Sequence, residues 1–451
     1  MKHPREDGQQ QMHEHGQMMQ RRHQRELWAN FATVALGLWL AASPFSFDYQ
    51  DSVLVWNDVI CGLLIAVFGF LSISYERGWA RWANCAIGIW LLFVPLVFWA
   101  PTPVAYVTET LIGTLVIAFS ILVPGMPGMR MMPGPDVPPG WSYNPSSWVQ
   151  RAPVIALGLI SFFIARYLAA YQLGYIDHAW DPFFDDSTVR VLDSKVSRAW
   201  PVSDAGFGAL AYMLEALSGF MGQRNRWRTM PWMVLMFGVL VIPLGITSIA
   251  LVIMQPVMVG AWCTLCLITA LFMLIMIPLS VDEVAAMARF MVKTRHQGKP
   301  FWINFWRGGT PDPENTEEDT TTFHAPPTEV ATTMVWGVTA PWNLLVSTAL
   351  GFWLMATPAV FGSAGSAADS SHLVGPLVAV VAVSAMAEII RSLRLVNVLA
   401  GAWLIAAPWL LAGSTTGSAL NDVVIGAALI ALSLPRGSIL QRYGGWDRLT
   451  R

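Results

Sequence analysis

Residues 260–280 have the sequence GAWCTLCLITALFMLIMIPLS, in which two cysteines three positions apart precede an apolar run. About 20 consecutive apolar residues are enough for one helix to cross a bilayer. Similar runs recur along the chain, and only 12% of its residues are charged, against about 25% in soluble domains. The sequence therefore predicts an all-α polytopic membrane protein, embedded in the lipid bilayer through about twelve transmembrane helices: 27–45, 54–74, 83–100, 106–123, 151–173, 203–221, 231–254, 258–281, 341–360, 372–390, 395–412 and 420–435.

The basic residues predict how these helices are oriented. Every cluster of Arg and Lys falls on the same side of a twelve-span arrangement: Arg21, Arg22, Arg25, Arg77, Arg81, Arg224, Arg226, Arg228, Arg289, Lys293, Arg295, Lys299, Arg307, Arg391, Arg394, Arg436 and Arg442. Because positive charge is retained in the cytoplasm, we expect both termini to be cytoplasmic and the loop 174–202 to face outward. We expect residues 1–26 to form a disordered cytoplasmic tail and 296–338 a cytoplasmic linker, disordered over 308–332.

Four stretches share one pattern: GLWLAASP from Gly37, GIWLLFVP from Gly88, GFWLMATP from Gly351 and GAWLIAAP from Gly401. A further glycine follows each proline by 17 or 18 residues, at Gly62, Gly113, Gly375 and Gly426. Since proline ends a helix and small residues let helices approach closely in lipid, each repeat predicts a helical hairpin. Acidic residues precede three of the later glycines by four positions, and we expect them to cap helix starts rather than line an ion pathway: Asp58, Glu109 and Asp422.

These segments resemble the SPW repeat family of small membrane proteins, through motifs such as ASPF at 42–45 and AAPW at 406–409. The resemblance implies two four-helix modules, over 27–123 and 339–436, that build structure and supply no chemistry. A central four-helix domain over 148–295 separates them.

In the central domain, Cys263 and Cys266 stand at the outward end of a span. A cysteine at a helix N-terminus has a lowered pKa, because the helix dipole and the free amides stabilise its thiolate. The second cysteine lies one turn deeper, at the edge of the hydrocarbon. This placement would let the first sulfur react with a thiol in water and the second with a lipid-soluble electron carrier.

The central domain resembles the vitamin K epoxide reductase family, which has four helices, a long outward loop and a Cys-x-x-Cys at the outward end of the fourth helix. VLDSK at 191–195 and GALAY at 208–212 are similar to the family's loop and second helix. The resemblance implies a thiol–disulfide oxidoreductase coupled to a quinone, ubiquinone or menaquinone. By that pattern Cys266 faces the quinone and Cys263 exchanges with an extracytoplasmic thiol protein.

The sequence departs from this family in two places. Family members carry two loop cysteines that relay electrons, and here Thr188 stands where the second would fall, with nothing upstream to supply the first. Some members place a quinone-contacting tyrosine where this chain has Ala270. We therefore expect a partner thiol to reach Cys263 directly, and we name Asp204 and Tyr212 as quinone-side residues.

Other interpretations of the cysteines stay open. Zinc needs four ligands, and only His178, Asp177 and other loop acids are available to complete a site, so we predict no metal centre. The pair could be inert packing, as we expect for Cys61 and Cys85. The stretches 12–23 and 126–132 combine Met with polar residues that suit copper, although we favour incidental composition.

The buried charges of the central domain suggest further expectations. We expect Arg166 to pair with Asp204 and Glu215 to reach Arg224 or Arg226, because lone charges are costly in a membrane. The predicted function is a quinone-coupled thiol–disulfide oxidoreductase in the plasma (inner) membrane of a prokaryote. The alternatives are a non-enzymatic scaffold with a degenerate reductase-like domain, and a metal or small-solute transporter using these charges. No motif for nucleic-acid binding is present.

Overall fold

The computed structural model describes residues 21, 23–100, 102–123, 126, 132, 134–311 and 322–448. Within them the chain is helical, with two isolated β-bridges and no strand. Twelve long helices form: α2 (Leu27–Ser46), α3 (Ser52–Leu71), α4 (Ala80–Val97), α5 (Pro103–Leu122), α6 (Trp148–Gln172), α8 (Asp204–Phe220), α10 (Pro231–Met254), α11 (Thr264–His296), α14 (Trp342–Phe361), α15 (Gly365–Ser384), α16 (Val396–Leu410) and α17 (Thr416–Ser433). The all-α prediction is confirmed.

Eleven helices in the described residues are long and apolar enough to cross a membrane. The twelfth expected span, 203–221, forms α8, which has 17 residues and packs along α6 inside the central bundle. Large apolar side chains such as Trp56, Phe70 and Leu399 stand exposed on the outside of the helices. Such an apolar surface would be unfavourable in water, whereas in a bilayer it contacts the apolar lipid chains. The chain is a multi-pass membrane protein.

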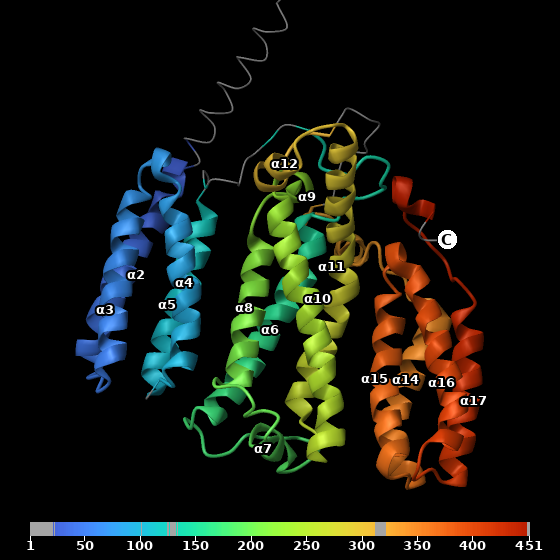
Figure 1. Ribbon diagram of the computed structural model, residues 1–451. Helices are drawn as coiled ribbons and strands as arrows, with labels where there is room; N and C mark the ends of the chain where they lie inside the picture. The colour runs from blue at the N-terminus through green and yellow to red at the C-terminus, as the bar shows by residue number, and fades with distance from the viewer. Residues whose placement is uncertain are drawn as a thin grey trace, which may run out of the picture.

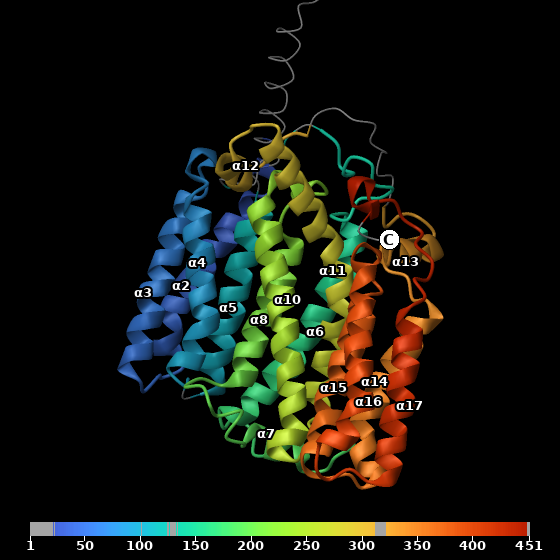
Figure 2. The ribbon, with the colours of Figure 1, turned by 45° about the vertical axis from the view of Figure 1, so that its right-hand side comes forward.

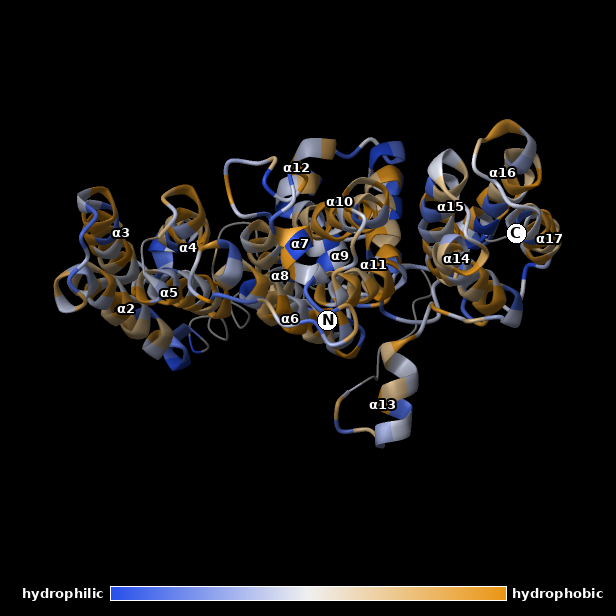
Figure 3. Cartoon of the chain, turned by 90° about the horizontal axis from the view of Figure 1, so that it is seen from below, coloured by the Kyte–Doolittle hydropathy of each residue, from blue (hydrophilic) through white to orange (hydrophobic). Residues whose placement is uncertain are grey.

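The long helices form three groups of four that lie in a row, as Figures 1 and 2 show from two sides and Figure 3 shows along the helices. Helices α2 to α5 make the first group and α14 to α17 the last. Between them, α6, α8, α10 and α11 make the central bundle, which contacts the first group through α8 and the last through α15. The short helix α7 (Ser187–Leu192) covers one end of the central bundle, and α9 (Arg226–Thr229) and α12 (Phe301–Arg307) lie at the other.

The glycine pattern places two backbones in direct contact in every hairpin. A Cβ added to Gly401 would lie 2.6 Å from the carbonyl oxygen of Gly426, and one added to Gly351 would lie 2.7 Å from that of Gly375. The pairs Gly37–Gly62 and Gly88–Gly113 meet in the same way. Close approach of this kind is how transmembrane helices gain packing energy without a hydrophobic driving force.

We predict that Gly401→Leu destabilises the last helical group, because the new side chain would overlap the backbone of α17. Overpacking of this kind costs about 1–3 kcal/mol or more, since backbone must move. Ala402→Leu is the matched control, because Ala402 is the next residue and its side chain is exposed. Thermal unfolding in detergent should show a lower midpoint for Gly401→Leu alone, and equal midpoints would refute the close-packing account.

The expectation that three acidic residues cap helices is wrong. Asp58, Glu109 and Asp422 are each the seventh residue of their helix, and all three are buried. The caps are Asp51, Thr102 and Thr415, whose side chains accept backbone N–H groups at the starts of α3, α5 and α17. The helices begin earlier than hydropathy indicates because these polar caps, outside the apolar runs, start them.

Residues expected to be irregular at the Arg-rich end are partly ordered. The segment expected to be disordered, 308–332, contains the start of helix α13 (Pro327–Met334). Residues 312–321 of that segment lie outside the described residues, and so does most of the expected tail 1–26. Proline at the first helical position presets the backbone angle of α13. The side chain of Gln150 fastens it to α6 by donating to the Thr333 carbonyl at 2.6 Å.

A buried ion pair lies at this same end of the central bundle. The guanidinium of Arg226 makes two 2.6 Å hydrogen bonds to the two carboxylate oxygens of Glu283 on α11, and both side chains are almost fully buried. Arg226 also donates to the carbonyls of Ser218 and Met221, where α8 ends. This one side chain therefore holds the end of α8 against α11.

Candidate functional site

The cysteine pair lies where α11 begins, at the end of the central bundle covered by α7. Before it, the chain leaves α10 through a π-helical turn, η2 (Gln255–Val259), which ends at Gly260 in the left-handed conformation. The side-chain oxygen of Gln255 accepts the Cys263 N–H at 2.9 Å. Short π-helical segments are frequently found at functional sites. Here the turn fixes Cys263 as the N-cap of α11.

Cys263 and Cys266 form a disulfide, with their Cα atoms 5.3 Å apart. The Cys263 sulfur also accepts the Cys266 backbone N–H at 3.2 Å. When the disulfide is reduced, this amide and the helix dipole would stabilise a thiolate on Cys263. The local geometry that the spacing predicted is therefore present.

The two sulfurs have different surroundings, and the difference is opposite to the one predicted from their depth along the helix. Cys263 is expected from the sequence to lie nearer water, yet its side chain is completely buried and packs with Leu192 and Ala179 of the loop 174–202. Cys266 is partly exposed and lines a pocket inside the bundle. The loop 174–202 folds over the start of α11 and shields Cys263, so a partner thiol cannot reach this cysteine directly as the sequence predicts.

Asp181 fastens that loop to α11. Its carboxylate accepts the Thr264 hydroxyl at 2.6 Å and the Thr264 N–H at 3.1 Å, and it accepts the Thr188 hydroxyl at 2.5 Å. Partial burial acts to raise the pKa of Asp181, but hydrogen bonds from Thr188, Thr264 and the Phe183 amide outweigh it and hold that pKa well below its ordinary value. We refer to Asp181, Thr188 and Thr264 as the loop clasp. Thr188, at the position expected for a loop cysteine, instead helps to close the loop.

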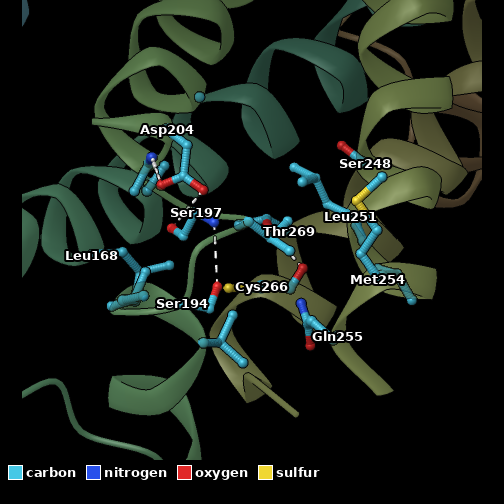
Figure 4. Close-up of a pocket in the computed structure, with 18 of the residues that line it drawn as sticks. Leu168, Ser194, Ser197, Asp204, Ser248, Leu251, Met254, Gln255, Cys266 and Thr269 are labelled. Atoms are coloured by element: carbon cyan, nitrogen blue, oxygen red, sulfur yellow. Dashed lines mark hydrogen bonds between the residues drawn. The ribbon is translucent and has the colours of Figure 1, made fainter. Parts of the chain in front are cut away.

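The pocket beside Cys266 contains both residues named from the sequence for the quinone side. It has a volume of about 120 Å³ and is lined by Asp204 and Tyr212 of α8, Ser248 of α10 and Thr269 of α11, among others. Figure 4 shows Cys266, Asp204, Ser248 and Thr269 around this space. The lining combines apolar side chains with a few hydroxyl groups, which is typical of a site for a small, mostly apolar ligand.

Asp204 is held in place by hydrogen bonds from the loop and from α6. It is the first residue of α8, where the helix dipole favours a carboxylate. Gln172 donates to it at 2.5 Å and Ser197 at 2.7 Å. Tyr212 lies deeper, near Ser248 and Thr269. The structure thus brings Cys266, Asp204 and Tyr212 to one pocket, while Cys263 lies outside it.

Two expected ion pairs do not form among the described residues. The Arg166 guanidinium lies over the Tyr106 ring, 5.3 Å from its centroid, and not against Asp204. A cation over an aromatic face is stabilised by the ring quadrupole, so Arg166 needs no carboxylate. Glu215 does not reach Arg226, which is taken by Glu283, and both Glu215 oxygens are buried with no hydrogen-bond partner in the described structure.

Within the part of the chain that the structure describes, no three or more His, Cys, Asp or Glu residues are arranged to hold a metal ion. Cys61 and Cys85 are separate, free and buried in the helical groups. The methionine-rich stretches 12–23 and 126–132 lie mostly outside the described residues.

Sequence reasoning missed the residues that position the cysteines. Asp181 and Gln255 both contact the start of α11, and neither belongs to a recognisable motif. The one available signal for Asp181 was a carboxylate in an outward loop near an unsatisfied helix N-terminus. For Gln255, it was an amide side chain within an apolar run, which needs a partner in lipid.

Two family models match the chain. A model of the vitamin K epoxide reductase family matches residues 152–281, and a model of the SPW repeat domain matches residues 27–123 and 330–435. Searches of curated proteins and of solved structures find no match. The first match covers the central bundle with its disulfide, and the second covers the outer helical groups. The chain therefore carries a vitamin K epoxide reductase family domain between two SPW repeat domain regions.

Proposed function

We propose that the central bundle passes electrons from an extracytoplasmic thiol protein to a membrane quinone, either ubiquinone or menaquinone, through Cys263 and Cys266. The observation that supports this most strongly is the Cys263–Cys266 disulfide, whose second sulfur lines a pocket within the membrane bundle. A family match to a reductase domain supports the same class of activity.

In this proposal the two sulfurs have different roles. A partner thiolate attacks the Cys263 sulfur and breaks its bond to Cys266, which leaves as a thiolate. A second partner thiol then displaces Cys263, so the partner leaves as a disulfide and both cysteines are reduced. The pair gives two electrons and two protons to a quinone beside Cys266, and the disulfide re-forms. Tyr212 and Ser248, with hydroxyl groups in the pocket, are the residues we propose to orient the quinone.

Because Cys263 is buried, the first step requires the loop to open. We predict that Asp181→Asn speeds reduction of the disulfide by a water-soluble thiol, since hydrogen bonds to a carboxylate are worth about 1.5–3 kcal/mol each and about 1.4 kcal/mol is a factor of ten. Thr264→Val should have the same effect in weaker form. Asp177→Asn, in the same loop and exposed, is the control. Equal reduction rates in all variants would show that the clasp does not limit access.

The lowered pKa of Asp181 means that the loop clasp should weaken only in strong acid. Because the folded pKa of Asp181 is lowered, its stabilisation is complete above the ordinary value of about 3.9 and disappears only as pH falls through the lower folded value. Loop opening in the wild type is therefore expected to stay constant from about pH 5 to 8.

We propose that the α7 end of the bundle faces outward from a prokaryotic plasma membrane and that both termini are cytoplasmic. The Arg-rich clusters at the opposite end support this orientation. We predict that an impermeant thiol reagent labels intact cells carrying Asp177→Cys but not those carrying Thr328→Cys, both sites being exposed. The protein without an added cysteine gives the background. Labelling of Thr328→Cys alone would show that the protein has the opposite orientation in the membrane.

The function is tested with the purified protein in nanodiscs, supplied with a dithiol peptide and a quinone. Quinol formation should match peptide oxidation one to one and should require both cysteines. Peptide oxidation without quinol, or quinol formation in a variant lacking both cysteines, would refute the proposal. The scaffold interpretation predicts neither reaction.

A further inference from the structure

A second hollow lies between the central bundle and the last helical group. Its volume is about 700 Å³, within the range of about 300–1,000 Å³ that holds ligands of moderate size. Central-bundle residues line one side, and Phe352 and Ala356 of α14 with His372 and Pro376 of α15 line the other. Helix α15 packs against α10, α11 and η2, so the hollow lies between helices that are in contact. We call it the inter-module groove.

The groove adjoins the pocket beside Cys266. Val252 of α10 and Ala270 of α11 line both spaces. Ala270 presents only a methyl group at the boundary. The pocket alone, at about 120 Å³, has room for little more than a small ring. A lipid-soluble carrier with a long apolar chain needs the larger space as well.

The groove is apolar along its length but carries polar groups near the cysteines. The Nδ1 atom of His372 is buried and has no hydrogen-bond partner among the described residues. Its ring lies 5.9 Å from that of Trp262, the residue before Cys263. Pro376 has no N–H to donate to the His372 carbonyl four residues earlier, so that oxygen lacks its helical partner. A lipid acyl chain cannot satisfy these groups.

These polar groups are departures from the repeat. Counted from the second glycine, His372 occupies the place of Val59, Thr110 and Val423 in the other three repeats. Pro376 likewise replaces leucine, threonine and alanine. The repeat thus differs on α15, one of the two helices of the last group that line the groove.

We propose that the inter-module groove binds the isoprenoid chain of the quinone, with His372 forming a hydrogen bond to the quinone ring. A quinone carbonyl can accept the imidazole N–H, and a quinol hydroxyl can donate to the His372 carbonyl, which receives no N–H from Pro376. Each redox form of the ring thus has a partner at His372. The last SPW region then acts as one wall of the substrate site. This proposal rests on the proposed function and adds the place of the chain and the part played by the repeat.

The test uses a long-chain quinone that carries a photoreactive azide at the end of its isoprenoid chain. After illumination of the protein in nanodiscs, mass spectrometry should find the label on peptides of α14 and α15. Ala356→Trp fills the groove and should lower this labelling about tenfold, equivalent to about 1.4 kcal/mol of lost binding. Ala406→Trp is the matched control, since Ala406 is the equivalent residue of the fourth repeat and does not line the groove.

Kinetics separate the chain from the ring. Ala356→Trp should raise KM for a long-chain quinone about tenfold and leave KM for a chainless quinone unchanged. His372→Leu should raise KM for both, and His372→Gln, which keeps a donor, should partly restore it.

The proposal fails if labelling of α14 and α15 is unaffected by Ala356→Trp, or if excess phospholipid removes the label as well as excess quinone does. The second result would make the groove an acyl-chain site. Quinol formation is measured on the same wild-type sample. If quinol forms but no label is found in the groove, the groove does not bind the isoprenoid chain. If label is found but no quinol forms, the oxidoreductase function is refuted.

Discussion

Cys266→Ser is expected to trap a mixed disulfide on Cys263. The Cys263 thiolate, stabilised at the start of α11, attacks the disulfide of an oxidised partner and releases one partner thiol. In the wild type Cys266 would then attack Cys263 and free the partner. With serine at 266 no second sulfur of this protein lies near, because the loop 174–202 contains no cysteine, so only the partner's own released thiol can reverse the adduct. Non-reducing gels with mass spectrometry of the shifted band should reveal the adduct.

Cys263→Ser should abolish turnover with protein thiols and trap no partner, because Cys266 opens into the pocket within the bundle and not toward water. Adding Asp181→Asn to Cys266→Ser should increase trapping, since the loop over Cys263 is then released. If Cys263→Ser traps the partner and Cys266→Ser does not, the roles of the two sulfurs are reversed. If neither variant traps a partner or alters thiol oxidation, the pair is inert packing.

Arg226→Met is expected to cost about 3–5 kcal/mol of stability, the usual effect of leaving a buried charge without its partner. Glu283 would keep its position on α11 with its main counter-charge removed, and the carbonyls of Ser218 and Met221 would lose their donor. Thermal unfolding in detergent measures the change. Because the pair lies at the end of the bundle away from the cysteines, the folded fraction should still form the Cys263–Cys266 disulfide.

The double variant Arg226→Met with Glu283→Leu should recover part of this loss, because no lone charge remains. Arg77→Met, an exposed arginine at the same end, is the control and should change little. A single Arg226→Met variant as stable as Arg77→Met would show that the pair does not hold α8 against α11.

The features that could be predicted from the sequence depend on local composition. Apolar length indicates the spans, and the spacing of Gly401 and Gly426 predicts their contact without knowledge of any other helix. The placement of Cys263 at the start of α11 follows from the apolar run behind it. Each of these inferences uses residues of one helix or one hairpin.

The features that could not be predicted join distant segments. Asp181 and Thr264 are 83 positions apart, so nothing in either segment indicates that the loop closes over Cys263. The sequence predicts that Glu215 reaches Arg224 or Arg226, yet the partner of Arg226 is Glu283, 57 positions away. Sequence proximity favours the wrong carboxylate because helix packing, and not chain distance, decides which charges meet. The inter-module groove has the same origin, since its walls come from two domains.

The central claim, that the cysteine pair passes electrons to a quinone, is tested most directly by the redox state of the pair in isolated membranes. The disulfide is first reduced with a small dithiol, which is then removed under anaerobic conditions, and free thiols are counted by alkylation with and without added quinone. We predict that the Cys263–Cys266 disulfide re-forms only when quinone is added, with an equal amount of quinol produced. A pair that stays reduced in the presence of quinone, or that re-oxidises equally without it, would contradict the account.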